Sequence, residues 1–287
     1  MRRSTSSLSE SDLWSSLVLP VLAGVGGAVV LLIALFLATE SWPFLSVVGP
    51  GRIFSDPRWS PMQGFYSLMP MLLASAGVAA GALLLAAPLG IGAAVFGRFH
   101  LPDGPASLFN ALLVTMAGIP SVVFGLWGLD EVVPLIAAGH PPGTSLVAGI
   151  LILAVMILPT VALTTSTALS AVPSCELQAA AALGMSTSGT ILGVALPSAR
   201  RGIRAGIVLA MGRALGETVA VLMVCGNVVQ IPTSVWDPVR PLTANIALEI
   251  AYASGTHRAA LFASGLLLTG FVAVLALGAA RVARSTT

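Results

Sequence analysis

The sequence predicts an all-α membrane protein, a polytopic bundle of six transmembrane helices. Of its 287 residues, 56% are hydrophobic and only 8% are charged, whereas a soluble domain carries about 25% charged residues. The apolar residues gather in runs long enough to cross a hydrocarbon core of about 30 Å as helices. Neither an internal repeat nor a separate soluble domain is evident. We therefore expect residues 1–287 to form a single transmembrane domain.

The predicted spans are rich in glycine and alanine, which suits helices that pack closely against each other. They cover residues 17–37, 69–96, 108–129, 145–169, 206–229 and 259–280. The first run is longer than the apolar core of a cleavable signal peptide, which has about 7–15 residues, so we expect it to be a retained span. The segment 38–68 between the first two spans contains four prolines and several aromatic residues, and we expect an ordered surface loop.

The arginines predict the orientation, because cytoplasmic segments of membrane proteins carry an excess of basic residues. With both termini cytoplasmic, eight arginines lie inside and four lie outside. The inside residues are Arg2, Arg3, Arg98, Arg200, Arg201, Arg204, Arg281 and Arg284, and the outside residues are Arg52, Arg58, Arg240 and Arg258.

The composition also argues against several kinds of chemistry. All 13 basic residues are arginine, so the chain has neither the lysine of a phosphate-binding loop nor a Schiff-base lysine. If ATP drives this protein, another chain hydrolyses it, and we expect no enzymatic activity, catalytic residue or cofactor here. The net charge of +2 does not indicate a nucleic-acid partner.

Cysteine and histidine give no sign of a metal site. Cys175 and Cys225 are expected to be unpaired thiols. The three histidines, His100, His140 and His257, lie in loops without metal-ligand spacing and are expected to be solvated.

Two charged residues, Arg213 and Glu217, stand inside the fifth predicted span. A charged side chain near a bilayer centre costs at least about 2.5–3.5 kcal/mol on insertion scales, so the pair requires a reason. Residues four apart share one helix face, and Gly212 and Gly216 could allow another backbone to approach. One hypothesis is a substrate path, because a guanidinium binds oxyanion oxygens through a planar fork. The other is a static ion pair that fixes the helices.

On the substrate-path hypothesis, Glu217 holds Arg213 when no substrate is present and weakens a site that would otherwise trap the anion, because a conduction site must also release its ligand. A weaker candidate is Ser121, which with Pro120 interrupts the third span and could expose backbone groups to a substrate. A tolerated kink is the alternative there, as it is for Pro159 and Thr160 in the fourth span.

The inside segment 170–205 predicts two short helices. Pro173 favours a helix start, Gln178–Leu183 is a strongly helix-forming run, and Gly184 ends it. A second short helix is expected over about 187–195, before Pro197. Such a compact unit could dock in a hydrophobic groove of a partner, or be a surface helix-turn-helix without one.

The stretch Gln178-Ala-Ala-Ala-Ala-Leu-Gly184, continuing to Leu196-Pro197, resembles the EAA loop of ABC importer permeases. In that family the loop docks on the ATPase subunit, so the resemblance implies that Gln178, Ala179, Ala180 and Gly184 contact an ATPase. The family has a glutamate where this chain has Gln178, and Glu176 is out of register, so the charge expected there is missing.

Further segments resemble the PstC-type membrane subunits of phosphate ABC importers. They are Ile119-Pro-Ser-Val-Val-Phe-Gly-Leu-Trp-Gly128, Pro88-Leu-Gly-Ile-Gly92, Arg213-Ala-Leu-Gly-Glu-Thr218 and Gly226-Asn227. The resemblance implies a MetI-like, type I importer permease in the bacterial cytoplasmic (inner) membrane. It also implies a heterodimer with a PstA-type permease, two cytoplasmic ATPase subunits and an extracytoplasmic phosphate-binding protein. By the same resemblance, Arg213 and Glu217 take part in phosphate passage.

Other functions stay open on the sequence. The nearest are a permease for another oxyanion, such as sulfate or molybdate, and the PstA-type sister subunit. An ion-coupled secondary transporter would leave the EAA-like loop without a purpose. An intramembrane enzyme is least favoured, since no predicted span pairs a nucleophile with a histidine base.

Overall fold

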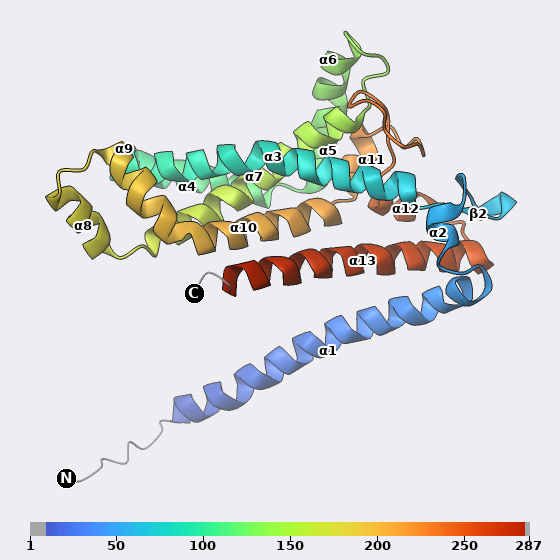
Figure 1. Ribbon diagram of the computed structural model, residues 1–287, viewed down its shortest axis with the longest axis horizontal. Coiled ribbons are helices and arrows are strands. Elements are labelled where there is room, and N and C mark those ends of the chain that lie inside the picture. Colours follow the sequence, from blue (N-terminus) through green and yellow to red (C-terminus); the bar gives the residue numbers. More distant parts are fainter. Residues whose placement is uncertain (1–9, 285–287) are drawn as a thin grey trace.

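The computed structural model describes residues 10–284 and shows a predominantly helical chain (Figure 1). The predicted all-α class is confirmed. Four described helices are long and apolar enough to cross a membrane, and one sharply bent helix pair adds a fifth candidate. Arg2 and Arg3, which enter the predicted orientation, lie outside the described residues.

The first and last helices run antiparallel along one side of the molecule (Figure 1). Helix α1 covers Glu10–Val47 and α13 covers Gly255–Arg284. Phe36 of α1 meets Phe262 of α13 edge-to-face, with ring centroids 5.6 Å apart. Within the described part of the chain, the apolar segment Val18–Val47 is almost entirely exposed. This surface is suited to lipid or to a partner chain.

Three helices form the centre of the bundle. They are α3 (Met69–Phe99), α7 (Leu146–Ser170) and α10 (Leu196–Gly216). Glycine permits their close approach, because a Cβ atom at Gly90 would lie only 2.8 Å from Cβ of Val161 on α7. A Cβ atom at Gly206 of α10 would likewise collide with Thr164. Gly90 and Gly206 therefore lie at helix contacts, as predicted for small residues in the spans.

The third predicted span, 108–129, is not one helix. Helix α4 (Asp103–Gly118) is followed after a bend of 90° by α5 (Ser121–Trp127), a π-helical turn η2 (Gly128–Val132) and α6 (Val133–Ala137). Pro120 disfavours a helical conformation in the residue before it, and Ile119 has an extended backbone (φ −64°, ψ 130°). The bend is a complete break, which exceeds the tolerated kink that we considered.

The fifth predicted span, 206–229, is wrong as a continuous helix. Helix α10 begins ten residues earlier, at Leu196, and ends at Gly216, and a short α11 follows over Val219–Val224. Glu217, between them, is extended (φ −69°, ψ 133°). Because α10 carries four arginines, it is not among the helices that are long and apolar enough to count as spans by themselves.

Short ordered elements cover the end of the bundle where α1 joins α3. They are α2 (Arg52–Ser55), β1 (Trp59–Ser60), the 3₁₀ turn η1 (Pro61–Gln63) and β2 (Phe65–Tyr66), with α12 (Leu242–Glu249) beside them. The two strands are antiparallel, with Trp59 opposite Tyr66. Phe44, Trp59, Tyr66 and Leu68 are buried here, so the predicted ordered loop is confirmed.

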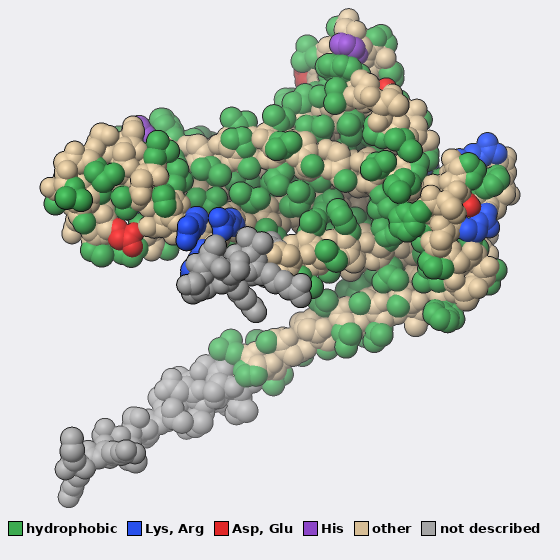
Figure 2. All heavy atoms as spheres, in the orientation of Figure 1, with side chains coloured by type: hydrophobic (Ala, Val, Ile, Leu, Met, Phe, Trp, Pro, Cys, Tyr) green, Lys and Arg blue, Asp and Glu red, His purple; other side chains and the backbone are tan. Residues whose placement is uncertain are grey.

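The opposite end carries α8 (Ser174–Ala182), α9 (Thr187–Thr190) and the π-helical turn η3 (Ile191–Ala195) (Figure 1). The second short helix does not stop before Pro197, because η3 leads directly into α10. The π turn lies just before Pro197, whose ring cannot be accommodated by a regular helix turn without a clash. Figure 2 shows charged side chains toward the ends of this face and hydrophobic side chains over the helices between them.

Candidate functional site

Glu217 lies in the break between α10 and α11 and accepts two hydrogen bonds there. Its carboxylate Oε1 accepts a hydrogen bond from the backbone N–H of Ala220 at 3.1 Å, which caps the first turn of α11. Its backbone carbonyl accepts from the hydroxyl of Thr243 at 2.7 Å, which ties the break to α12. Glu217 therefore acts as a local cap, and it does not share a helix face with Arg213 as we predicted.

Arg213 lies in the last turn of α10 and is half-buried. Its Nη1 donates to the hydroxyl of Thr160 on α7 at 3.4 Å, the long end of the hydrogen-bond range. The ion pairs between described side chains include Arg52–Asp56, Arg240–Glu249 and His257–Glu249, and none of these involves Arg213. Arg213 and Glu217 are not paired in this structure, so the predicted resting pair and the static ion pair are both absent.

The glycines beside this arginine face open space. No heavy atom of the described chain outside their own helix would lie within 4 Å of a Cβ atom at Gly212 or Gly216. Within this chain, then, they do not mediate the close backbone contact that we considered. This face of α10 is open to a partner chain or to a ligand.

Ser121 is half-buried and begins α5, the second half of the other broken segment. Helix α5 packs on α11, where a Cβ atom at Gly125 would lie 2.8 Å from Sδ of Met223 and 3.0 Å from Cα of Ala220. Helices α5 and α11, the second halves of the two broken segments, are therefore in close contact. In the described part of the chain, no hydrogen bond joins Ser121 to Arg213 or to Glu217.

The space next to Glu217 is too small for an oxyanion in this conformation. A cavity of about 10 Å³ lies there, lined by Ser75, Val78, Leu215, Glu217 and Thr243 among others. Such a volume holds about one water molecule. The main chain of Leu242 also donates to the Ser75 hydroxyl at 2.8 Å, which keeps α12 against α3.

A second charged cluster, the Glu249 cluster, was missed in the sequence. Glu249 Oε1 accepts from Arg240 at 2.8 Å, and Oε2 lies 2.8 Å from His257 Nε2 and accepts from the indole of Trp59 at 3.0 Å. Arg240 also donates to Asn245 Oδ1 at 3.1 Å and to the backbone carbonyl of Asn227 at 2.8 Å. No motif could have found it, because its members are scattered over nearly 200 residues. The expectation that His257 is solvated is wrong.

The segment expected to dock on an ATPase forms a protruding unit. Gln178 and Ala179 are exposed, Ala180 is buried, and Gly184 ends α8 with φ +72°. Leu183 stands 82% exposed beside them. Glu176 accepts a 2.6 Å hydrogen bond from Ser198, which ties α8 to the start of α10.

The two cysteines and His140 form neither a disulfide nor a metal-binding group in the described residues. Cys175 is exposed and Cys225 is buried, and neither forms a disulfide. No group of three or more histidine, cysteine or acidic side chains there is arranged to hold a metal ion. His140 is exposed and stacks on Trp236, with ring centroids 3.9 Å apart.

The fold matches that of membrane subunits of ABC transporters. Residues 86–286 match the family model of the binding-protein-dependent transport system inner membrane component, and the chain belongs to that family. The sequence also matches the phosphate transport system permease protein PstC of Mesorhizobium japonicum. It is 34% identical to that protein over 88% of this chain and 81% of the relative. Within the family, the chain is a member of the PstC-type permeases.

Other matches agree. The PstC of Haemophilus influenzae is 31% identical over 82% of this chain and 81% of its own length. Among solved structures, the inward-facing MetNI methionine ABC transporter aligns with a TM-score of 0.60 at 19% identity, over 80% of this chain and 99% of that one. A bacterial ABC transporter involved in alginate import aligns with a TM-score of 0.61 at 15% identity, over 93% and 99%. These structures confirm the MetI-like permease fold.

Proposed function

We propose that this chain is the PstC-type permease of an ATP-driven inorganic phosphate importer in the bacterial inner membrane. Membership of the PstC-type permeases supports the substrate. The observation that carries the proposal is Arg213, a half-buried cation beside a helix break with no carboxylate partner in the described residues. A guanidinium in such a place can replace water around a phosphate oxyanion with charge-assisted hydrogen bonds.

Glu217 and Ser121 have supporting roles in the proposal. Glu217 now caps α11 through Ala220, so pairing with Arg213 requires the break between α10 and α11 to rearrange. In that rearranged state the carboxylate competes with phosphate for the guanidinium and promotes release. Ser121 begins α5, which packs on α11, and a movement of α11 would therefore carry α5 with it.

The partners in the proposal are a PstA-type permease, two cytoplasmic ATPase subunits and an extracytoplasmic phosphate-binding protein. The exposed apolar surface of α1 and the open face at Gly212 and Gly216 support a second membrane subunit. The protruding α8, with Gln178 and Leu183 exposed, supports docking of the ATPase. Hydrolysis belongs to that ATPase, and this chain is neither an enzyme nor a cofactor carrier.

The proposed orientation places α8 and both termini in the cytoplasm. The start of α1, the end of α13 and the α8–α9 unit lie toward the same end of the molecule (Figure 1), which supports it. The Glu249 cluster then lies on the extracytoplasmic side.

The experiment is uptake of radiolabelled phosphate into proteoliposomes that contain the purified importer, with the binding protein outside and ATP inside. We expect ATP-dependent uptake that unlabelled phosphate suppresses and that equimolar sulfate or molybdate does not. Suppression by sulfate or molybdate would reassign the substrate. Uptake driven by a proton gradient without ATP would overturn the proposal in favour of a secondary transporter.

A further inference from the structure

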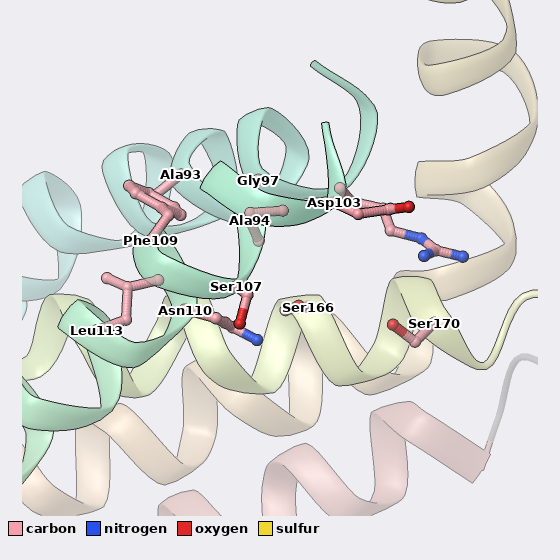
Figure 3. Close-up of a pocket in the computed structure, with 12 residues that line it drawn as sticks. Ala93, Ala94, Gly97, Asp103, Ser107, Phe109, Asn110, Leu113, Ser166 and Ser170 are labelled. Atoms are coloured by element: carbon pink, nitrogen blue, oxygen red, sulfur yellow. The ribbon is translucent and has the colours of Figure 1, made fainter. Parts of the chain in front are cut away.

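A polar cavity lies away from the α10–α11 break, at the end of the bundle that carries α8. It has a volume of about 270 Å³ and is bounded by the end of α3, the first half of α4 and the end of α7 (Figure 3). Half of its twelve lining residues are polar. These are Arg98, Asp103, Ser107, Asn110, Ser166 and Ser170.

The two charged residues of this cavity do not satisfy each other. Arg98 and Asp103 both line it, yet among the described residues they form no ion pair with each other or with any other side chain. Both side chains are exposed to solvent, so a ligand that carries a negative and a positive group can reach both of them. Asp103 also makes the cavity unfavourable for a simple anion, because its carboxylate would repel it.

The remaining walls suit an amphipathic molecule. Ser107 and Asn110 lie together on α4, with Ser166 on the facing helix α7 (Figure 3). Phe109 and Leu113 form an apolar wall on the α4 side. The outer surface of α4 next to this wall is apolar and exposed, as Leu108 and Leu112 show. The cavity therefore opens beside a surface that lipid chains can cover.

We propose that this cavity binds the headgroup of a zwitterionic aminophospholipid of the phosphatidylethanolamine type. Arg98 binds the phosphodiester through its planar fork, and Asp103 binds the ammonium group. Arginines between membrane helices on the cytoplasmic side bind the phosphate of lipid headgroups, and the proposed orientation puts Arg98 on that side. An anionic lipid such as phosphatidylglycerol would satisfy Arg98 and leave Asp103 unpaired.

The test is native mass spectrometry of the protein, extracted from membranes in its natural assembly and titrated with phosphatidylethanolamine or phosphatidylglycerol. We expect preferential retention of phosphatidylethanolamine. Arg98→Gln should reduce the bound fraction about fivefold, the effect of one basic residue near a lipid surface. Asp103→Asn should remove the preference between the two lipids, and Arg98→Lys should retain binding. The matched control is Arg204→Gln, which removes an exposed arginine of α10 outside the cavity.

Each other outcome overturns the proposal. Equal retention of both lipids by the unaltered protein would remove the role of Asp103. Unchanged binding in Arg98→Gln, or an equal loss in Arg204→Gln, would show nonspecific adhesion. Displacement of the lipid by millimolar inorganic phosphate or phosphoethanolamine would show that the site binds a soluble phosphate compound. Size-exclusion profiles that match the unaltered assembly, together with binding by Arg98→Lys, separate these outcomes from misfolding.

Discussion

Two arginines of this permease, Arg213 and Arg240, occupy opposite situations. Arg240 donates to Glu249, Asn245 and the carbonyl of Asn227, and its side chain is only 20% exposed. Within the part of the chain that the structure describes, the Arg213 side chain makes a single hydrogen bond, to Thr160 at 3.4 Å. The first charge is paired with a carboxylate of the protein itself. The second is left with unused donors next to a helix break.

Under the proposed function, this difference separates a structural charge, Arg240, from a substrate-binding one, Arg213. A buried charge is tolerated when it is paired and hydrogen-bonded, and the Glu249 cluster meets this condition by joining the loop at Trp59 to the ends of α12 and α13. Arg213 does not meet it within this chain. An arginine kept in a costly location without a carboxylate partner favours a role in ligand binding, as the proposed function requires.

The largest effect on stability is expected at the Glu249 cluster. Arg240→Gln leaves the carboxylate of Glu249 nearly buried with only His257 and Trp59, and should lower the free energy of unfolding by about 3–5 kcal/mol. Thermal unfolding of the purified assembly measures it. The double variant Arg240→Gln/Glu249→Gln should recover part of the loss, because neither charge is then left alone. Equal melting temperatures for the single variant and the unaltered protein would show that the cluster is not structural.

A smaller loss of stability is expected at the contact between α5 and α11, where the two broken helices meet. Gly125→Ala places a methyl group against Met223 and the backbone of Ala220, and overpacking of this kind costs about 1–3 kcal/mol. The matched control is Gly118→Ala, where a Cβ atom meets no heavy atom within 4 Å. If both variants melt at the same temperature, the contact between α5 and α11 is looser than the structure shows.

The smallest effect concerns the loop after α11. Backbone N–H groups of Ser234 and Thr233, with the Thr233 hydroxyl, lower the pKa of Asp237. Its ionised form therefore stabilises the fold above the unfolded pKa of about 3.9, and the contribution is lost as the pH falls through the lower folded value. The melting-temperature difference between the unaltered protein and Asp237→Ala should shrink below about pH 4. A melting-temperature difference that persists unchanged at lower pH would show that the stabilisation does not depend on the charge of Asp237.

The sequence predicted the helical class and the positions of most apolar segments, because the length of each apolar run is visible in the sequence itself. It also located the α8 unit, where Gly184 ends a helix-forming run. It failed at Glu217, since nothing local shows that the carboxylate would cap α11 and leave the helix face of Arg213. That outcome depends on Thr243 and on the packing of α12, which are tertiary contacts.

The Glu249 cluster could not be predicted for the same reason. Trp59, Arg240 and His257 meet only after α1, α12 and α13 have assembled around them. Pro120 was recognised as an interruption, but a proline signals a break without giving its angle. The 90° bend occurs together with tertiary packing of α5 against α11, which the local sequence does not reveal.

The most direct test of the account is phosphate uptake by the Arg213→Gln variant, expressed per assembled complex and measured beside the Arg204→Gln control. Since hydrogen bonds to charged groups contribute about 1.5–3 kcal/mol, uptake should fall by about 10–100-fold. The melting temperature should be unchanged, because the one hydrogen bond that the Arg213 side chain makes to the described residues is long. Normal uptake by Arg213→Gln at normal abundance would contradict the central claim that Arg213 binds phosphate on its path.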